Sequence, residues 1–435
     1  RGQSGRTGKR IFGGDFLDWL REGFSLKSLS MKVIPEGRVI HPNVPVTVVE
    51  GQLAVAQILE TSLLNHLNFQ VLIATKAARI LRSGRGQHLL EFGLRRGHAT
   101  GANAGARAAL IGGAHFTSNV GLSHVLGLPP KGTHAHSMVQ VFVSLGMEEL
   151  DAFQAYADIY PDDCLLLVDT IDTLNSGVPN AIKVFEELKR KGHTPVGIRI
   201  DSGDLGALAI QAAKMLNEAG FAQTTIVLSD NLDELAIDGI INEITKEAAK
   251  SGVDPDELIK RLSYGVGTKL ITSEGASALG GVYKLVAVQK DDQWLPATKI
   301  SDSPEKSPIP GKKGVWRLYN KEGRAIADLL SLEEENPRTM DTIESYHPFE
   351  AERRQSIPVS DIGEIEPLLV SIMDKGKLVY ELPSIEEMRK TRRRDEERLE
   401  SGVRRLIDPE IYPVLLTRRL WELKKRLTHS NPDSG

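Results

Sequence analysis

The segment Leu165-Leu166-Leu167-Val168-Asp169-Thr170 is the first of four apolar runs that end in polar or glycine residues. The other three are Val196–Ile200 before Asp201-Ser202-Gly203-Asp204, Thr225–Leu228 before Ser229-Asp230-Asn231, and Leu262–Val266 before Gly267-Thr268. The runs end roughly 30 or more residues apart, the length of a strand–helix–strand unit. The intervening segments Val184–Lys189 and Ala207–Ala219 carry apolar residues at helical spacing. Short apolar strands alternating with helices predict a parallel sheet, and polar residues at its carboxyl ends indicate the active face of a (β/α) barrel.

Helix capping is the simpler explanation for these polar residues, because Asp, Ser and Asn are favoured at helix N-termini. Capping accounts for one polar residue per strand. It does not account for Arg199 inside an apolar run, or for the cluster from Asp201 to Asp204. Side chains alternate along a strand, so Arg199 and Asp201 are predicted to share one face. We therefore interpret the strand ends as a functional site.

Composition narrows the class of protein. The chain has 435 residues, 40% of them hydrophobic and 26% charged, which is enough for two domains and an appendage. The net charge of −4 gives no reason to expect a nucleic-acid partner. The only cysteine, Cys164, excludes a disulfide framework and a cysteine metal site, which suits the reducing cytosol. No apolar run approaches the length of a membrane span, so we expect no membrane partner.

Four consecutive parts are expected along the chain. They are a basic, Gly-rich opening that is non-native or disordered (1–14), an N-terminal α/β domain partly completed by C-terminal segments (15–130), a catalytic (β/α) barrel (131–290), and return strands with C-terminal helices (291–435).

The last of these parts is expected to be strongly charged. It should contain a hairpin at Trp316–Leu329, an exposed acidic stretch at 330–345, and helices at Ile385–Arg398 and Leu415–Leu427. The basic run Arg392–Arg394 stands beside Asp395-Glu396-Glu397, which we interpret as a solvated helix face rather than a nucleic-acid patch.

Two imidazoles stand two residues apart in Gly132-Thr133-His134-Ala135-His136-Ser137. A zinc site would need a third ligand, and the sequence has no His-Glu-x-x-His helix to supply one. A nucleophilic or proton-transferring histidine is the better interpretation, with a plain loop as the alternative.

Other charged and glycine residues suggest phosphate and carboxylate binding. Arg95-Arg96 suits bidentate capture of a carboxylate or phosphate, unless it forms a structural ion pair. The turn Gly265-Val266-Gly267-Thr268 can bind phosphate through backbone N–H groups, although a plain tight turn is as good an explanation. Asp169, Asp201 and Asp204 can hold magnesium or orient ribose hydroxyls. Together these groups favour transfer of a phosphorylated sugar over glycoside hydrolysis, in which the arginines would be surplus.

Eight motifs, in order and at compatible spacing, resemble those of the nicotinate phosphoribosyltransferase family. They are Glu-Phe-Gly-Leu-Arg-Arg (91–96), Thr-Ser-Asn-Val (117–120), Gly-Thr-His-Ala-His-Ser (132–137), Leu-Val-Asp-Thr (167–170), Gly-Ile-Arg-Ile-Asp-Ser-Gly-Asp-Leu (197–205), Ser-Asp-Asn-Leu-Asp-Glu (229–234), Gly-Val-Gly-Thr (265–268) and Leu-Gly-Gly-Val-Tyr-Lys-Leu-Val (279–286). The resemblance runs from about Phe16 to the C-terminus. It implies an α/β fold in which an α/β N-terminal domain stands on an irregular (β/α) barrel, followed by a charged helical C-terminal extension. It also implies a homodimer with active sites at the interface.

The resemblance implies an activity as well. Nicotinate and 5-phosphoribosyl 1-diphosphate would give nicotinate mononucleotide and diphosphate, coupled to ATP hydrolysis as in the ATP-dependent ligases. This is the first step of NAD salvage from nicotinate, in the cytoplasm. In that family the second histidine of the Gly-Thr-x-Ala-His-Ser motif, here His136, is phosphorylated by ATP, and Mg²⁺ is required.

The resemblance also assigns roles to individual residues. The catalytic residues would be His136, Asp169 and Asp201. The substrate-binding residues would be Arg95, Thr133 and Arg199 around nicotinate and ribose, Gly132 and Ser137 of the histidine motif, and Asn231, Gly267 and Thr268 on the 5-phosphate side. Magnesium would be held through the substrate diphosphate, with Asp201 and Asp204 as candidate protein ligands.

The chain departs from the family pattern in two places. We expect the opening Tyr-x-Leu-Thr-Met segment, whose tyrosine stacks on the pyridine, to be absent from this chain. Residues Gly97-His98-Ala99-Thr100-Gly101 replace the usual Ala-Gln-Gly-Pro-Asp pattern, which affects the loop near Arg96.

Three alternatives to this function are considered. A nicotinamide phosphoribosyltransferase carries an acid near the pyridine, where this chain has Thr133 and His134, and a neutral or cationic lining favours a carboxylate substrate. A quinolinate phosphoribosyltransferase needs a denser basic pocket and uses no ATP. A truncated, non-catalytic homologue that only dimerises or binds nucleotide is the third.

Overall fold

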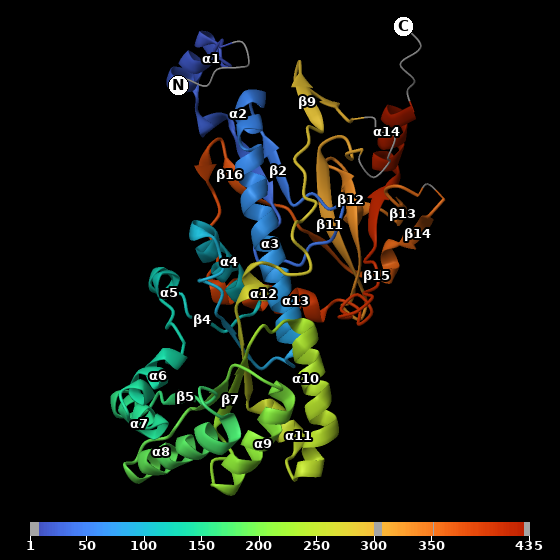
Figure 1. Ribbon diagram of the computed structural model, residues 1–435. Coiled ribbons are helices and arrows are strands. Elements are labelled where there is room, and N and C mark those ends of the chain that lie inside the picture. The colour runs from blue at the N-terminus through green and yellow to red at the C-terminus, as the bar shows by residue number, and fades with distance from the viewer. Residues whose placement is uncertain (1–7, 300–306, 351, 430–435) are drawn as a thin grey trace. The chain divides into compact units, whose positions relative to one another are not determined.

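The computed structural model describes residues 8–299, 307–350 and 352–429, and in these ranges no helix combines the length and apolar character needed to cross a membrane. The chain divides into two compact units, residues 67–280 and residues 1–66 together with 281–435 (Figure 1). These bounds differ from the expected 131–290, because two strands before residue 131 join the barrel sheet. The expected disordered opening falls partly on residues 1–7, which lie outside the described residues, and α1 begins at Gly14.

Unit 67–280 is built on a six-stranded parallel sheet in the order β4-β3-β8-β7-β6-β5. Its strands are β3 (His88–Glu91), β4 (Phe116–Thr117), β5 (Leu165–Leu167), β6 (Gly197–Ile200), β7 (Thr225–Ser229) and β8 (Leu262–Val266). The last four coincide with the four apolar runs, so the predicted parallel sheet is confirmed. Parallel pairing brings the carboxyl ends of all six strands to one edge.

Helices connect these strands. They are α3 (Glu60–Ser83, which begins in the other unit), α4 (Ala99–Gly112), α5 (Val120–Leu126), α6 (His136–Ser144), α7 (Glu149–Ile159), the π-helix η3 (Thr173–Gly177), α8 (Val178–Arg190), α9 (Leu205–Glu218), α10 (Glu234–Glu247), η4 (Ala248–Ser251), α11 (Pro255–Lys260) and α12 (Thr268–Ile271). Asp204, Asp233 and Asp254 accept backbone N–H bonds as N-caps of α9, α10 and α11. Capping is therefore the correct explanation for Asp204.

Two glycines permit close approaches that fix strand ends. A Cβ at Gly177 would lie 1.8 Å from the Val168 carbonyl oxygen, so the end of η3 packs directly on the chain that follows β5. Gly197 has φ +156°, and a Cβ there would lie 1.9 Å from the Thr225 carbonyl oxygen. Any side chain at either position would push these segments apart.

The other unit contains two sheets and a hairpin. The first sheet has the order β17-β16-β1-β2, the hairpin is β10-β9, and the second sheet has the order β14-β13-β18-β12-β11-β15. The strands are β1 (Ser30–Val33), β2 (Thr47–Glu50), β9 (Ala287–Lys290), β10 (Gln293–Pro296), β11 (Lys313–Asn320), β12 (Ala325–Leu332), β13 (Thr342–Tyr346), β14 (Arg354–Pro358), β15 (Ile362–Pro367), β16 (Val370–Asp374), β17 (Lys377–Leu378) and β18 (Val414–Thr417). The predicted hairpin at Trp316–Leu329 is confirmed by the antiparallel pair β11–β12.

The helices of this unit are short apart from its C-terminal pair. They are α1 (Gly14–Asp18), η1 (Trp19–Gly23), η2 (Leu26–Ser28), α2 (Leu53–Ile58), η6 (Pro337–Thr339), η7 (Val359–Asp361), α13 (Ile385–Glu397) and α14 (Arg418–His429). Leu415 was expected to be helical, but it lies in β18, which pairs with β12 and β13 inside the sheet. Leu420 of α14 packs with Leu330 and Leu416 in the core beside that sheet.

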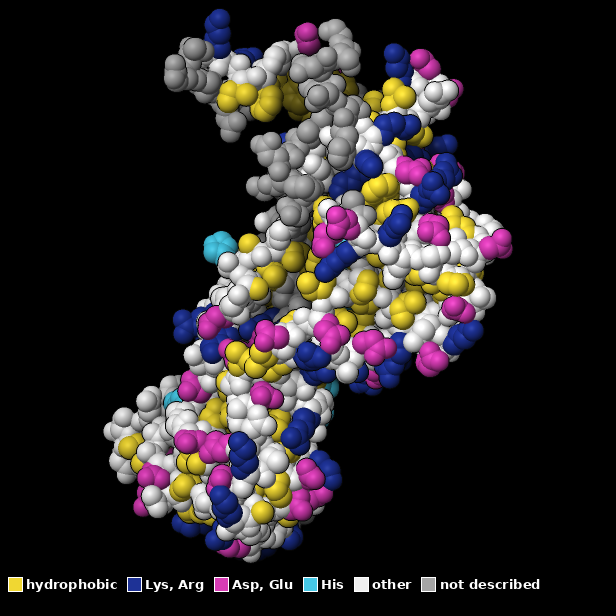
Figure 2. Space-filling model, turned by 90° about the vertical axis from the view of Figure 1, so that its right-hand side faces the viewer, with side chains coloured by type: hydrophobic (Ala, Val, Ile, Leu, Met, Phe, Trp, Pro, Cys, Tyr) yellow, Lys and Arg dark blue, Asp and Glu magenta, His cyan; other side chains and the backbone are white. Residues whose placement is uncertain are grey.

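The surface carries both signs of charge. On the face in Figure 2, Lys and Arg side chains are intermixed with Asp and Glu, and neither sign forms a continuous stripe. Exposed pairs such as Arg419 with Glu334 at 2.8 Å illustrate this mixing.

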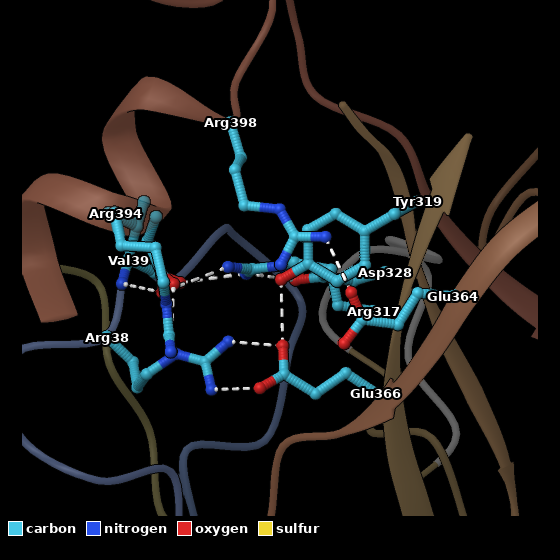
Figure 3. A network of polar contacts seen from close by, with 10 residues as sticks. Arg38, Val39, Arg317, Tyr319, Asp328, Glu364, Glu366, Arg394 and Arg398 are labelled. Atoms are coloured by element: carbon cyan, nitrogen blue, oxygen red, sulfur yellow. Dashed lines mark hydrogen bonds and ion pairs between the residues drawn. The ribbon is translucent and has the colours of Figure 1, made fainter. Parts of the chain in front are cut away.

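A buried network of charged side chains connects the sheet that contains β11 and β12 to α13 and to the segment after β1 (Figure 3). Arg317 on β11 donates from Nε and Nη2 to Asp328 at 2.7 and 2.9 Å, and from Nη1 to Asp395 at 3.3 Å. Arg38 donates to Asp395 at 2.7 Å and to both oxygens of Glu366 at 2.8 Å. Burial lowers the pKa of Arg317, but its ion pairs outweigh burial and raise it above the ordinary value. Pairing keeps these buried charges tolerable.

Two expectations for the C-terminal part are wrong. Asp395 is not on a solvated face, because it is only 2% exposed and is paired within this network. The stretch 330–345 is not exposed throughout, because it includes the end of β12 and most of β13, and Leu330, Ser331 and Ile343 are fully buried there. Both segments are hydrophilic in sequence, but they pack against partners far away along the chain.

Candidate active site

Arg199 on β6 is held by every nitrogen of its guanidinium group. Nε donates to Ser229 Oγ at 2.7 Å, Nη1 to Thr133 Oγ1 at 2.9 Å, and Nη2 to Asp201 Oδ1 at 2.8 Å. Its guanidinium carbon lies 5.3 Å from the centroid of the Phe92 ring. The predicted shared face of Arg199 and Asp201 is confirmed. The result is a fixed cation at the carboxyl edge of the sheet.

Asp201 is stabilised as a carboxylate by this arrangement. Burial raises its pKa, but hydrogen bonds from Ser229 and Arg199 and the Arg199 charge outweigh burial, so the pKa lies below its ordinary value. Ser229 Oγ donates to Asp201 Oδ1 at 2.5 Å. Asp201 Oδ2 faces away from these donors and lies 3.7 Å from His136 Nε2.

His136 is the first residue of α6, and its side chain is 37% exposed. Nε2 lies 3.8 Å from Asp169 Oδ1 and 3.7 Å from Asp201 Oδ2, and Nδ1 lies 3.1 Å from Thr170 Oγ1. Neither carboxylate is within hydrogen-bond distance of Nε2, but two negative charges beside that nitrogen favour a proton on it, so we assign the proton of the neutral ring to Nε2. Nδ1 then carries the lone pair, which is the requirement for a nucleophile.

His134 has a different environment and a structural role. Its Nε2 accepts a hydrogen bond from the Leu167 N–H at 3.0 Å, and its ring packs at 5.0 Å from that of Tyr156. Burial lowers its pKa, which keeps the ring neutral. The lone pair of Nε2 is therefore already used, and of the two imidazoles only His136 is arranged to react.

Asp169 connects β5 to β6. Its Oδ2 accepts from the Asp201 N–H at 3.0 Å and from Ser202 Oγ at 2.6 Å, whereas its buried Oδ1 accepts no hydrogen bond. Asp204 lies apart from this contact, because its Oδ1 caps α9 through the Ala207 N–H at 3.2 Å. The structure thus places Asp169 beside the backbone of Asp201 and uses Asp204 as an N-cap.

The carboxylates near His136 could bind magnesium only together with other ligands. Within the described ranges, no three His, Cys, Asp or Glu side chains are grouped to hold a metal ion. Asp201 Oδ2 is nevertheless a carboxylate oxygen without a hydrogen-bond donor, on a side chain that is 25% exposed, whereas Asp169 Oδ1 is buried. Mg²⁺ commonly takes one or two carboxylates and completes its shell with water and phosphate oxygens. The residues therefore suit an ion shared with a bound diphosphate.

The other predicted site residues lie on segments that follow the strands. Arg95 is exposed in the turn after β3 and makes no ion pair with a described residue. Gly132 and Ser137, on either side of the two histidines, are also exposed. Asn231 has a left-handed φ of +46° in the loop after β7, where the chain turns sharply.

Gly267 and Thr268 occupy the junction between β8 and α12. A Cβ at Gly267 would lie 3.0 Å from the Phe92 carbonyl oxygen, so the junction packs against the segment after β3. Thr268 begins α12, and the neighbouring Lys269 donates to Asp233 at 2.9 Å. Among described residues, no hydrogen bond or ion pair joins Gly267 or Thr268 to His136.

Three contacting residues were not singled out from the sequence. Ser229 bridges Arg199 and Asp201, and Thr170 contacts His136. Glu91, fully buried at the end of β3, accepts from Thr117 Oγ1 at 2.6 Å and from the Gly93 N–H, and burial raises its pKa. The sequence did contain a signal for Glu91, because it is a charged residue directly after the apolar pair Leu89-Leu90. Arg199 was found by the same kind of signal, a charge within an apolar run.

Comparison with known proteins gives a consistent result. The family model described as Nicotinate phosphoribosyltransferase (NAPRTase) family matches residues 87–322, and the model of the Nicotinate phosphoribosyltransferase C-terminal domain matches residues 312–424. A nicotinate phosphoribosyltransferase from Bacillus subtilis (strain 168) is 39% identical over 91% of this chain and 76% of its own length. The Homo sapiens protein of the same name is 32% identical over 95% of this chain and 82% of its own length.

Solved structures share the fold. The crystal structure of human nicotinic acid phosphoribosyltransferase superposes with a TM-score of 0.76 at 29% identity, covering 96% of this chain and 85% of that chain. The nicotinate-nucleotide pyrophosphorylase from Pyrococcus furiosus gives a TM-score of 0.63 at 22% identity, covering 89% of this chain and 84% of that chain. The predicted irregular (β/α) barrel is confirmed by the sheet and by this likeness. The sequence matches show that the chain belongs to the nicotinate phosphoribosyltransferase family.

Proposed function

We propose that this chain forms nicotinate mononucleotide and diphosphate from nicotinate and 5-phosphoribosyl 1-diphosphate, with ATP hydrolysed through a phosphohistidine at His136. This would make it an ATP-dependent ligase at the first step of NAD salvage from nicotinate. The observation that carries the proposal is the setting of His136. One ring nitrogen lies within 4 Å of Asp169 and Asp201, and the other lies 3.1 Å from the Thr170 hydroxyl oxygen.

Charge indicates which nitrogen takes the phosphoryl group. A phosphoryl group on Nε2 would be placed beside two carboxylates whose oxygens lie within 4 Å of that atom, and like charges at such distances repel. On Nδ1 the group avoids this repulsion. The ring would then keep its Nε2 proton and become cationic, and Asp169, whose Oδ1 lies 3.8 Å from Nε2, would stabilise that cation. A phosphoryl group on a cationic ring is readily transferred, which suits an energy-coupling intermediate.

Arginine side chains support a carboxylate substrate. Arg199 is fixed at the carboxyl edge of the sheet. Arg95 lies in the turn after β3, the same segment that contributes Phe92, whose ring lies beside Arg199. A guanidinium group binds a carboxylate with two hydrogen bonds, whereas it has no acceptor for the N–H₂ of an amide. We therefore assign nicotinate rather than nicotinamide to this site.

Magnesium is proposed as the required ion, with Asp201 as its protein ligand. When bound, Mg²⁺ would neutralise the diphosphate leaving group. Asp201 Oδ1 is taken by Arg199 and Ser229, which leaves Oδ2 as the oxygen available to the ion. Asp204 is not included, because it caps α9.

A substrate assay tests the proposed function. The purified chain is incubated with 5-phosphoribosyl 1-diphosphate, Mg²⁺ and either carboxyl-labelled nicotinate or labelled nicotinamide, with and without ATP. We expect nicotinate mononucleotide, at a rate raised by ATP, and no product from nicotinamide. Product from nicotinamide alone would establish the alternative substrate. Nucleotide binding without any product would indicate a non-catalytic homologue.

Arg199→Lys is expected to lower kcat/KM for nicotinate about tenfold or more, because lysine keeps the charge but cannot reproduce the planar fork that binds Ser229, Thr133 and Asp201 together. Steady-state kinetics at saturating 5-phosphoribosyl 1-diphosphate would measure this. Arg190→Lys, in the last turn of α8, is the matched control and should behave as wild type. An unchanged kcat/KM in Arg199→Lys would remove the guanidinium geometry from the site.

We further propose a homodimer located in the cytosol. Large apolar side chains are exposed around α5 to α7, including Val125, Leu145 and Ile159, and such surfaces often mark protein contacts. The single cysteine, Cys164, is buried, and a chain without disulfides suits a reducing compartment. Sedimentation equilibrium should give twice the chain mass, and a monomer at all concentrations would contradict the dimer. Cell fractionation tests the location.

A further inference from the structure

Two consecutive residues contact the two nitrogens of the His136 ring. Asp169 Oδ1 lies 3.8 Å from Nε2, and Thr170 Oγ1 lies 3.1 Å from Nδ1. With the proton of the neutral ring on Nε2, Nδ1 can only accept, so the Thr170 hydroxyl is the donor. One short segment thus lies beside both ring nitrogens, and Asp201 Oδ2 lies beside Nε2 as well, at 3.7 Å.

Hydrogen bonds hold the chain both before and after Thr170. The Val168 N–H bonds to the Arg199 carbonyl at 3.0 Å, and Asp169 Oδ2 receives two hydrogen bonds. Asp172 caps η3 through the N–H groups of Leu174 at 3.1 Å and Asn175 at 2.8 Å. Threonine also has few χ1 rotamers, because it is branched at Cβ. The backbone on both sides of Thr170 is therefore held in place, and the Thr170 hydroxyl can hold the imidazole in one orientation.

We infer that Thr170 is a positioning residue, which keeps Nδ1 of His136 directed toward the γ-phosphorus of ATP. This inference rests on the proposed phosphorylation of His136. In that step the Nδ1 lone pair forms a bond to the γ-phosphorus, and the bond from that phosphorus to the β–γ bridging oxygen breaks. ADP leaves with the electron pair, and Nε2 keeps its proton. The Thr170 hydroxyl releases Nδ1 as the bond to phosphorus forms.

Without the hydroxyl, the ring loses its directional contact at Nδ1. Rotation of the imidazole by half a turn about its Cβ–Cγ bond then places a carbon beside residue 170 and directs Nδ1 elsewhere. Only part of the population would present the lone pair correctly. The loss corresponds to one neutral hydrogen bond, so the phosphorylation rate should fall about tenfold.

The test compares Thr170→Val, which keeps the shape, with Thr170→Ser, which keeps the hydroxyl. Two rates are measured for each protein. The first is single-turnover transfer of label from γ-labelled ATP to acid-labile protein label, and the second is nucleotide formation without ATP. Thr170→Val should lower the first rate about tenfold and leave the second unchanged, while Thr170→Ser stays within about twofold of wild type in both. Nitrogen NMR of labelled histidine should show one His136 tautomer in wild type and a mixture in Thr170→Val.

Each outcome has a distinct meaning. Wild-type labelling kinetics in Thr170→Val would overturn the inference and leave the proposed function standing. An equal fall in both rates, or a Thr170→Ser protein as slow as Thr170→Val, would reduce Thr170 to a packing residue and also overturn it. A wild-type protein that takes no acid-labile label would overturn the phosphohistidine itself. If Thr170→Val does not fold, Thr170→Ala provides the same comparison.

Discussion

His136→Asn should lose acid-labile labelling from γ-labelled ATP, with a fall of about 10³-fold or more in the ATP-coupled rate. Asparagine is similar in size to the part of the imidazole that includes Nδ1, and its amide can still contact Thr170. It has no basic lone pair that could attack phosphorus. Asp169 and Asp201 would keep their places, because backbone and side-chain donors outside His136 hold them.

The residual activity of this variant is as informative as the loss. Arg199 and its three partners do not depend on His136, so nucleotide formation without ATP should persist near the wild-type rate. His193→Asn is the matched control, since His193 lies in the loop before β6, near the amino edge of the sheet, and pairs with Asp162 at 2.9 Å. It should label like wild type. Equal label in the His136 and wild-type proteins would place the phosphorylated residue elsewhere.

Arg317→Met should strongly destabilise the protein, lowering the free energy of unfolding by about 3–5 kcal/mol. Methionine fills much of the same space but removes the paired cation of the buried Asp328, while Asp395 keeps only Arg38. Burial already raises the pKa of Asp328 against the lowering effect of Arg317, so removal of the arginine drives this carboxyl further toward its protonated form.

Tryptophan fluorescence in urea measures this prediction cleanly. All four tryptophans, Trp19, Trp294, Trp316 and Trp421, belong to the unit that contains Arg317. Their signal therefore follows that unit even if the two units unfold separately. Arg419→Met is the control, because the pair between Arg419 and Glu334 is exposed and should contribute less than about 1 kcal/mol. A similar small change in both variants would show that the buried network contributes little to stability.

The barrel sheet was predictable because its signals are local. Apolar runs of strand length and polar residues at their ends both appear in sequence order, and parallel pairing alone then brings Asp169, Arg199 and Asp201 together. Family resemblance supplied the role of His136. Periodicity could not have separated it from His134, because the difference depends on the Leu167 N–H, which lies more than 30 residues away.

The errors have the opposite origin. Asp395 occurs in a run of charged residues that is typical of a solvated helix, and its partner Arg38 stands 357 positions earlier. Leu415 directly precedes a helical pattern, but it lies in β18, which pairs with both β12 and β13. Such distant or geometric conditions leave no local pattern.

One unit consists of two separate chain segments, residues 1–66 and 281–435, and this affects how the protein folds during synthesis. Residues 67–280 form a continuous segment, so a ribosome synthesises every strand of the barrel sheet before it reaches β9. The other unit cannot close at that stage. Arg38 emerges early and must wait for Asp395, and β12 and β13 must wait for β18, whose last residue is Thr417. Domains tend to fold in the order in which they are synthesised. The barrel should therefore fold on a nascent chain in which β1 can pair with β2 but still lacks its other neighbour, β16. That open edge of β1 is the part that chaperones would need to protect.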